Sequence, residues 1–314
     1  MDPSRLAAHL TTIRDLIRWG GSAFNRAGLA FGHGSDNAMD EARHLVLHSL
    51  ALPVDVADDY LSAHVTPEEA EVALNLLQRR IDERQPAPYL TGEAWFAGLP
   101  FFVDQRVLVP RSPIAEIIEA EFQPWLDDRE PLRILDVGTG SGAIAIACAM
   151  AFPDAEVVGT DVSEDALAVA RRNAERHGVS PRMRWRIADL YDGLDDEAPF
   201  DLIVTNPPYV SGEEMDTLDP EYRHEPTIAF SGGGDGLDLV ERLIFATPPH
   251  LAPGGLFVLE VGHTCFALEQ RWPEMPIEWV ELERGGLGVG VLEADDLDAW
   301  VAHCHECAAS ATGE

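Results

Sequence analysis

Residues 132–142 read Leu-Arg-Ile-Leu-Asp-Val-Gly-Thr-Gly-Ser-Gly, an apolar run that meets three closely spaced glycines. The apolar part is typical of a buried parallel strand, and the next run, residues 143–148, opens a helix. Glycines between a strand and a helix let a ligand approach the backbone closely. Their spacing, G-x-G-x-G, does not meet the dinucleotide fingerprint, and a lone glycine-rich loop is a weak signal. The interpretation therefore depends on the strands predicted downstream of the glycines.

Two of these strands each end in an acid. Residues 155–160 lead to Asp161, about 20 residues after the glycines, where a nucleoside-binding sheet holds a carboxylate toward the ribose hydroxyls. Residues 183–187 lead to Ala188-Asp189-Leu190, where a second carboxylate could accept from an adenine amino group. If only one of these acids were present, the simpler interpretation would be a solvent-exposed acid in a loop. Three such segments at the ends of successive strands predict a nucleoside pocket.

A fourth strand, residues 200–205, runs directly into Asn206-Pro207-Pro208-Tyr209. Proline has no backbone N–H and holds the residue before it in extended geometry, so strand pairing stops and the carbonyls stay able to accept. The Asn206 side-chain oxygen and the Pro207 carbonyl then form two acceptors for the two hydrogens of one planar NH2 group. Tyr209 adds an aromatic face against that plane. A turn that only caps the strand is the simpler alternative.

This order of motifs resembles the class I S-adenosylmethionine-dependent methyltransferases over roughly residues 111–295, and Asn-Pro-Pro-Tyr narrows the resemblance to enzymes that methylate planar nitrogen. The resemblance implies an α/β fold with a Rossmann-like seven-stranded sheet, and S-adenosyl-L-methionine as the cofactor. The cofactor-binding residues that it implies are Gly138, Thr139, Gly140, Ser141, Gly142, Asp161, Asp189, Leu190 and Asn206. The implied catalytic residues are Asn206, Pro207 and Tyr209, and the implied substrate-binding residues are Asn206, Pro207, Pro208 and Tyr209.

An N-terminal helical domain, expected to recognise the substrate, is predicted over residues 1–88. Helical spacing begins with Leu6, Leu10, Ile13 and Ile17, and a second helix is expected over about 40–50. A third begins at Thr66-Pro67-Glu68-Glu69, a capping box with proline at the first helical position. Its apolar stripe is expected at Val72, Leu76 and Ile81. Proline at positions 86 and 88 then ends the helical pattern.

A β-hairpin linker over residues 89–111 and a methyltransferase domain over residues 112–300 are predicted next. The linker shows two short strands around Gly98 and a third expected strand at residues 106–109. Ser112 is expected to cap a helix that runs to about Phe122. Late in the domain, residues 276–282 and 287–292 should form a hairpin with an antiparallel edge strand.

A tail over residues 301–314 contains His303-Cys304-His305-Glu306-Cys307, a spacing that suggests zinc ligands. A zinc site usually needs a second pair, and the other two cysteines, Cys148 and Cys265, fall inside predicted fold elements. We therefore expect no metal.

The helical domain, the hairpin linker and the Asn-Pro-Pro-Tyr domain together resemble the protein-(glutamine-N5) methyltransferases, which modify a glutamine side-chain amide. One branch acts on peptide chain release factors and typically carries Arg-Pro-Glu-Thr-Glu at the linker exit. This chain has Arg-Ser-Pro-Ile-Ala-Glu at residues 111–116. Residues 107–116, with residues 32–37 and 222–226, resemble the other branch, which acts on the third protein of the large ribosomal subunit. The resemblance implies that basic protein as partner, with release factors as the alternative.

The composition bears on two rival functions. The 314 residues include 55 acids and 22 bases, all of them arginine, for a formal net charge of −33. An acidic chain lacks the basic footprint of a duplex-DNA binder, which argues against an adenine or cytosine amino-methyltransferase. A non-catalytic ribosome-assembly factor is disfavoured by the intact tetrapeptide at Asn206. Because no apolar run reaches a membrane span and no signal-peptide pattern opens the chain, we expect a cytoplasmic protein.

The acidic, lysine-free composition has two explanations. An acidic surface attracts a basic partner, or carboxylates keep the protein soluble in a salty cytoplasm, where salt screens their repulsion. The lack of lysine along the whole chain favours salt adaptation.

Salt adaptation predicts that the melting temperature rises from low salt to about 1 M potassium chloride, because the screening length falls to roughly 3 Å. A thermal melt in a potassium chloride series measures this effect. A melting temperature that stays flat or falls would contradict the explanation.

Overall fold

The structure is a computed structural model that describes residues 6–126 and 129–312. The chain divides into two compact units. The first comprises the residues up to Ala94 together with Val103–Gln105 and Leu218–Glu225, and the second comprises Trp95–Phe102, Arg106–Thr217 and the chain from Pro226 onward. The domain boundaries expected at residues 88, 111 and 300 stay a prediction.

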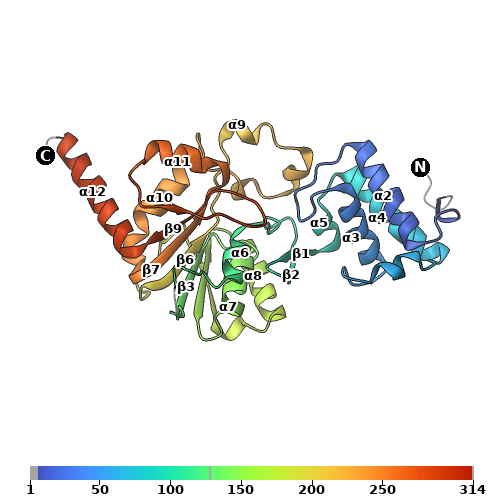
Figure 1. The fold of residues 1–314 in the computed structure, drawn as a ribbon, viewed down its shortest axis with the longest axis horizontal. Helices are drawn as coiled ribbons and strands as arrows, with labels where there is room; N and C mark the ends of the chain where they lie inside the picture. Colours follow the sequence, from blue (N-terminus) through green and yellow to red (C-terminus); the bar gives the residue numbers. More distant parts are fainter. Residues whose placement is uncertain (1–5, 127–128, 313–314) are drawn as a thin grey trace. The chain divides into compact units, whose positions relative to one another are not determined.

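The first unit is built from helices that begin at side-chain caps (Figure 1). The helices are α2 (Ile13–Ala27), α3 (Ala38–Ser49), α4 (Pro67–Glu83), the short α5 (Ala87–Thr91) and the 3-10 turn η1 (Asp58–Ser62). Thr12 and Thr66 each form a capping box with the acid three residues later. Asn37 caps α3 by accepting from two backbone N–H groups. The second and third helices, and the cap at Thr66, were predicted correctly.

Two expectations for this unit were wrong. Leu6 to Ile17 do not form one helix: Thr12 is extended, bridges to His64 and starts α2 afresh. The stripe expected on α4 was also wrong at Val72, which is 54% exposed, whereas Leu76 and Ile81 are partly buried against the core of this unit. The buried positions of α4 are Ala70, Ala73, Leu74, Leu77 and Arg80. Leu74 and Leu77 supply the large apolar side chains of this face, and the two alanines let the neighbouring helices approach closely.

Arg80 is fully buried in this unit and is neutralised by two carboxylates. Its Nε donates to Glu41 at 2.8 Å and its Nη1 to Glu221 at 3.3 Å, while Nη2 donates to the Ala30 carbonyl at 2.9 Å. Arg84 also contacts Glu221, at 3.0 Å. Glu221 lies in η3 (Pro220–His224), so the network joins the segment Leu218–Glu225 to helices far away in sequence.

Breaking this network should destabilise the helical unit. Arg80→Ala leaves the buried Glu41 without a cation and leaves Glu221 with only the part-exposed Arg84, which we expect to cost about 3–5 kcal/mol of unfolding free energy. Hydrogen exchange at the amides of α2, α3 and α4 measures it. Arg79→Ala is the matched control, because Arg79 pairs with Glu83 on the exposed side of the same helix and should change stability by about 0.5 kcal/mol. Equal effects would contradict the role given to Arg80.

The second unit is built on a seven-stranded sheet of order β5-β4-β3-β6-β7-β9-β8. Its strands are β3 (Arg133–Val137), β4 (Glu156–Asp161), β5 (Met183–Ile187), β6 (Phe200–Thr205), β7 (Leu251–Glu260), β8 (Glu278–Trp279) and β9 (Val289–Glu293). The first five pair in parallel, and β9 is antiparallel to both β7 and β8. The predicted parallel strands and the closing hairpin are confirmed.

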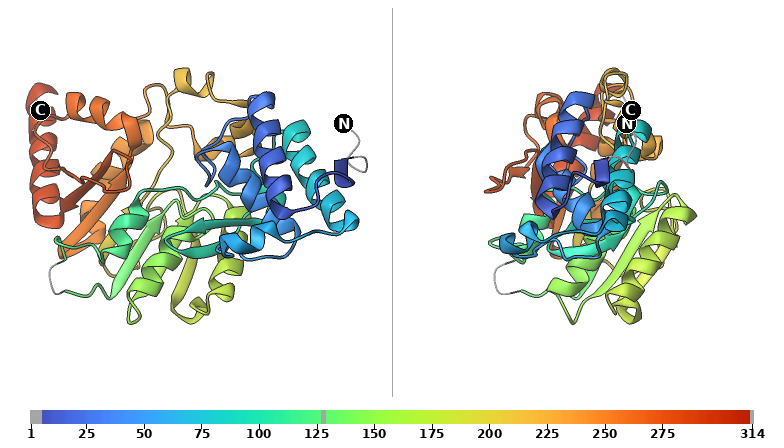
Figure 2. Two further views of the ribbon diagram at one scale, coloured as in Figure 1. Left: turned by 45° about the vertical axis from the view of Figure 1, so that its right-hand side comes forward. Right: turned by 90° about the vertical axis from the view of Figure 1, so that its right-hand side faces the viewer.

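Helices cover both faces of the sheet (Figures 1 and 2). Alternate strand residues point to opposite faces: Ile134, Leu202 and Val258 enter one core, and Leu135, Ile203 and Phe257 the other. The first core is packed by α6 (Ile114–Glu119), α7 (Ala143–Ala151) and part of α8 (Glu164–Arg176); the second by α10 (Asp238–Ala246), α11 (Cys265–Arg271) and α12 (Ala294–Thr312). This is the three-layer arrangement of a class I methyltransferase, as predicted.

The linker region follows the prediction in part. The strands β1 (Glu93–Phe96) and β2 (Leu99–Phe102) pair around a turn at Gly98. Residues 106–109 form no strand, because the chain turns at Arg106 and bends at Val107. Helix α6 ends at Glu119, earlier than expected, because Glu121 and Phe122 adopt positive φ. Among the described residues, no helix has the length and apolar character needed to cross a bilayer.

Several short elements and the C-terminal helix complete the unit. Helix α9 (Gly212–Met215) and the turns η4 (Thr227–Ala229), η5 (Pro248–His250) and η6 (Gly262–Thr264) join longer elements, and η2 (Ser180–Arg182) precedes β5. Helix α12 is continuous through residue 300, where a tail was expected to begin. The described residues contain no group of three side chains placed to hold a metal ion.

Candidate functional site

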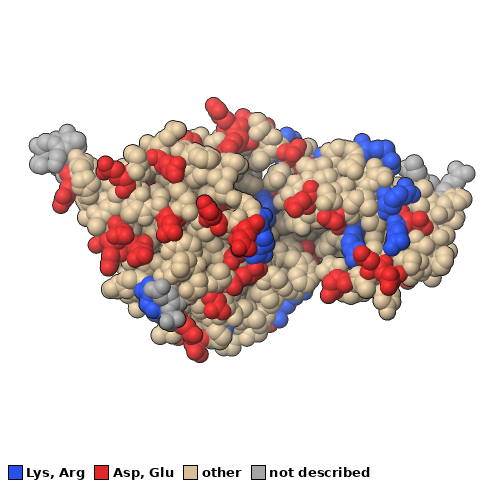
Figure 3. All heavy atoms as spheres, in the orientation of Figure 1, with Lys and Arg blue, Asp and Glu red and all other residues tan. Residues whose placement is uncertain are grey.

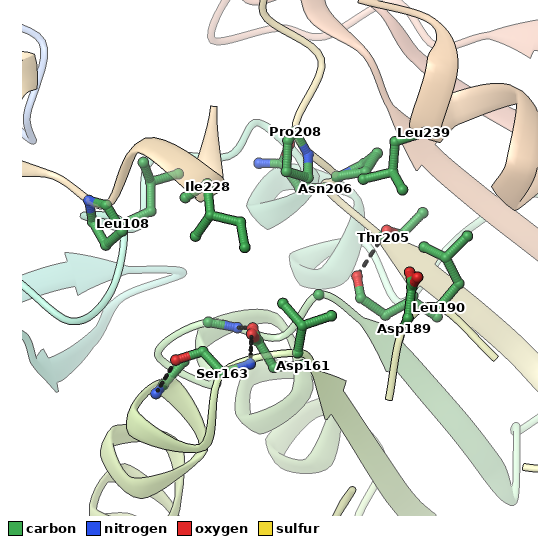
Figure 4. Close-up of a pocket in the computed structure, with 18 of the residues that line it drawn as sticks. Leu108, Asp161, Ser163, Asp189, Leu190, Thr205, Asn206, Pro208, Ile228 and Leu239 are labelled. Atoms are coloured by element: carbon green, nitrogen blue, oxygen red, sulfur yellow. Dashed lines mark hydrogen bonds between the residues drawn. The ribbon is translucent and has the colours of Figure 1, made fainter. Parts of the chain in front are cut away.

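A pocket of about 420 Å³ lies at the carboxyl ends of four adjacent parallel strands. Figure 4 shows Asn206 and Pro208 on one side of it and Asp161 and Ser163 on the other. In an open parallel sheet, ligands bind at this edge, where the strand order reverses; here that point lies between β3 and β6. The lining residues include Arg106, Leu108, Gly138, Gly140, Asp161, Ser163, Asp189, Leu190, Thr205, Asn206, Pro207, Pro208, Ile228 and Leu239.

The glycine loop after β3 leaves its pocket side open. Gly138 and Gly140 have φ of 75° and 53°, which glycine adopts without strain. A Cβ at either position would meet no atom within 4 Å, so the missing side chains leave room beside the backbone. Thr139, Ser141 and Gly142 do not line the pocket. Thr139 and Ser141 are buried, and Gly142 packs against Ala170 and Trp185, so these three shape the loop from behind.

The carboxylate of Asp161 holds this loop in place. It accepts from the backbone N–H of Gly140 and of Ser163, both at 2.9 Å. Burial raises its pKa, while the backbone hydrogen bonds oppose that shift. Asp161 therefore joins the loops after β3 and β4 and also lines the pocket.

Asp189 and Leu190 line the same pocket from the end of β5. Asp189 Oδ2 accepts from Arg242 at 2.9 Å, on a side chain that is half exposed. Leu190 has φ of 57°. Both residues thus lie where the sequence places them, with Asp189 already paired to one arginine.

The ladder of β6 stops at Thr205, which pairs with Val137 on one side and Leu259 on the other. Thr205 Oγ1 also donates to the Val137 carbonyl at 2.8 Å. The next three residues, Asn206, Pro207 and Pro208, line the pocket. Within residues 6–126 and 129–312, nothing hydrogen-bonds to the Asn206 side chain or to the carbonyls of Asn206 and Pro207. These oxygens are therefore able to accept from a ligand.

Tyr209 is not among the lining residues, although it belongs to the predicted set. Its hydroxyl donates to Glu260 Oε1 at 3.0 Å, and its carbonyl accepts from Thr264 Oγ1 at 2.9 Å. Burial, together with the charge of Glu260, raises the pKa of Tyr209 well above its usual value. The phenol is therefore neutral and held by its hydroxyl.

Two buried carboxyl groups beside the site were missed from the sequence. Glu260 ends β7 and accepts from Tyr209 and from the Ser112 hydroxyl. Asp136, just before the glycine loop, accepts from Thr139 Oγ1 at 2.6 Å and from the Ala145 N–H at 3.1 Å. Burial raises the pKa of each group to about 7. In the sequence, each of these carboxyl groups is an acid at or near the end of an apolar run, and this pattern could have identified them.

The residues that line the pocket fit a nucleoside joined to an amino acid. An open glycine backbone beside Asp161, and a second acid at Asp189, supply acceptors for ribose hydroxyls and for amino groups. The described chain offers no competing side chain in the space over Gly138 and Gly140.

Comparison with known proteins decides the family. Residues 122–219 match the family described as Methyltransferase small domain. The ribosomal protein uL3 glutamine methyltransferase of Xanthomonas campestris pv. campestris is 50% identical over 304 residues, covering 97% of this chain and 98% of that protein. The chain belongs to the family of ribosomal protein uL3 glutamine methyltransferases. The protein of the same description from Bordetella pertussis is 47% identical over 292 residues, covering 92% of this chain and 97% of that protein.

These matches confirm the predicted family and, with it, the predicted cofactor. The chain is a methyltransferase that uses S-adenosyl-L-methionine. Among solved structures, ribosomal protein L11 methylase from Lactobacillus delbrueckii subsp. bulgaricus is 23% identical with a TM-score of 0.39, over 56% of this chain and 74% of that chain. A similarity at that level says nothing about substrate.

The raised pKa of Asp136 predicts a pH effect on stability. The folded chain holds the proton up to about pH 7, whereas the unfolded chain loses it near 3.8. The contribution of Asp136 to the unfolding free energy of the cofactor-free protein should therefore fall as pH rises from about 4 to 7. Chemical denaturation of the protein and of Asp136→Asn across this range isolates the Asp136 contribution, because Glu260 is common to both. A difference between the two proteins that does not change with pH would contradict it.

Proposed function

We propose that this chain transfers a methyl group from S-adenosyl-L-methionine to the side-chain amide nitrogen, N5, of a glutamine in ribosomal protein uL3. The observation that carries the proposal is the pair of acceptors at the end of β6. Asn206 Oδ1 and the Pro207 carbonyl lie beside a pocket suited to the cofactor and have no hydrogen bond to another described residue. Two adjacent acceptors match the two hydrogens of a carboxamide NH2 group.

The cofactor would be held by the lining residues of the pocket. We assign Gly138 and Gly140 to its amino-acid part, Asp161 to its ribose and Asp189 to its adenine. When bound, the cofactor supplies an electrophilic methyl group on a positively charged sulfur. Thr139, Ser141, Gly142 and Leu190 support this arrangement from the loop and from the end of β5.

Asn206 and Pro207 would then orient the acceptor nitrogen and stabilise it. An amide nitrogen is a poor nucleophile because its lone pair is delocalised into the carbonyl. Two acceptors on its N–H bonds fix the direction of the lone pair and favour the positive charge that develops on nitrogen. That interaction grows toward the transition state, so it lowers the barrier rather than only binding substrate.

The partner fits the charge of this chain. Both relatives are described as acting on ribosomal protein uL3, and the net charge here is −33. Acidic side chains dominate the methyltransferase unit on the face shown in Figure 3. Such a surface attracts a basic protein and speeds encounter with it. We place the reaction in the cytoplasm, where ribosomal proteins are made.

A labelling experiment tests the proposal. The purified protein is given methyl-labelled cofactor with uL3, with a release factor or with duplex DNA, and the label is mapped by mass spectrometry. We expect label on a glutamine of uL3 alone. Label on the release factor or on DNA, with none on uL3, would overturn the assignment.

Two substitutions separate acceptor alignment from cofactor binding. Asn206→Ala should lower turnover by about 100- to 1000-fold, by analogy with losing one hydrogen-bonding group at a developing charge, while the dissociation constant for cofactor stays near normal. Asp161→Ala is the contrasting variant and should weaken cofactor binding first. Calorimetry and initial rates measure the two effects. Equal loss of binding and turnover in Asn206→Ala would make Asn206 structural.

A further inference from the structure

Tyr209 is fixed from several directions although it does not line the pocket. Its hydroxyl donates to Glu260, and its carbonyl accepts from Thr264. Two glycines leave the room that it occupies: a Cβ at Gly232 would lie 2.7 Å from the Tyr209 Cα, and one at Gly262 would lie 2.9 Å from the ring. These two hydrogen bonds and the close packing against the two glycines therefore hold the tyrosine in a single position.

Glu260 is the buried charge-bearing group in this arrangement. It lies at the end of β7 and is 5% exposed. One carboxylate oxygen accepts from Tyr209 and the other from Ser112. Ser112 Oγ in turn accepts from the N–H of Ile114 at 3.1 Å, at the start of α6. A single side chain thus joins the acceptor tetrapeptide to residues 111–116, the stretch in which the two branches of the resembled family differ.

We propose that Glu260 is a positioning residue for methyl transfer, which holds Tyr209 and, through it, the two acceptor oxygens of Asn206 and Pro207. This inference rests on the proposed function. Pro207 and Pro208 have fixed φ angles, so fewer backbone torsions can absorb a shift of Tyr209 before it reaches the Pro207 carbonyl. Because Ser112 shares the carboxylate, the same residue sets the start of α6.

A carboxylate suits this role better than an amide. Both bound groups are hydroxyl donors, and the carboxylate, ionised above its pKa of about 7, offers an acceptor to each. Glutamine at this position would keep one acceptor oxygen and present N–H donors to the other hydroxyl. One of the two hydroxyls would have to turn or move. Glutamine has nearly the same shape, so the substitution changes the hydrogen bonding with little change in packing.

The test compares Glu260→Gln, Tyr209→Phe and the double variant in methylation of uL3. We expect each single change to lower kcat by about tenfold to a hundredfold, as small misplacements of reacting groups do, with the cofactor dissociation constant unchanged within about twofold. The double variant should be no slower than the slower single variant, because both changes break the same contact. Glu197→Gln is the matched control: Glu197 is also largely buried, but pairs with Arg133 and Arg184 outside the pocket lining, and kcat should stay normal.

Three outcomes would overturn the inference. They are full activity in Glu260→Gln, losses that multiply in the double variant, and a fall in kcat matched by an equal loss of cofactor binding. If Glu260→Gln fails to fold, Tyr209→Phe alone decides, since it keeps the carboxylate and removes only the hydroxyl; full activity in that variant rejects the inference. Failure of the unsubstituted protein to label uL3 would instead reject the proposed function.

Discussion

Two consecutive prolines end the hydrogen-bonded ladder of β6, and the arrangement of the candidate site depends on that interruption. Had Pro207 carried an N–H in a continuing strand, the carbonyls at this edge would pair with β3 or β7, as those of the preceding residues do. The interruption leaves two oxygens beside the pocket with no donor among the described residues. The rest of the site serves to keep this short irregular segment in one place.

That task explains why buried polar groups gather around the pocket. Asp136 fixes the glycine loop through Thr139 and Ala145, and Asp161 joins that loop to the one after β4. Glu260 plays the equivalent part behind Tyr209. Each is a carboxyl group at the end of a parallel strand, where the regular pairing of the sheet ceases and hydrogen-bond donors of the loops need acceptors. Binding residues and supporting residues therefore come from the same positions on neighbouring strands.

Local patterns predicted most of the sheet because several of its strands are short apolar runs that end near a glycine, a proline or an acid. Residues 200–205 were delimited correctly for that reason. Residues 183–187, in which apolar residues alternate with Arg184 and Arg186, were also delimited correctly. The stripe of α4 was misplaced at Val72 because the fully buried face includes Arg80, a charged residue that an apolar pattern does not mark. The role of Glu260 could not be predicted from the sequence, because its two hydrogen-bond donors lie 51 and 148 residues away along the chain. Pairing between distant polar side chains leaves no periodicity to detect.

The segment Leu218–Glu225 belongs to the helical unit, although the chain on either side of it belongs to the methyltransferase unit. Its acids are partners of buried cations or rings: Glu221 contacts Arg80 and Arg84, and Glu225 contacts His33 at 3.2 Å. A single cut near residue 94 would thus not yield two self-sufficient halves. The shorter fragment would lose Glu221 and Glu225, which contact its buried Arg80 and His33, and the longer one would keep these acids without their partners. The helical unit is therefore a discontinuous domain, and a fragment meant to contain it has to include residues 218–225.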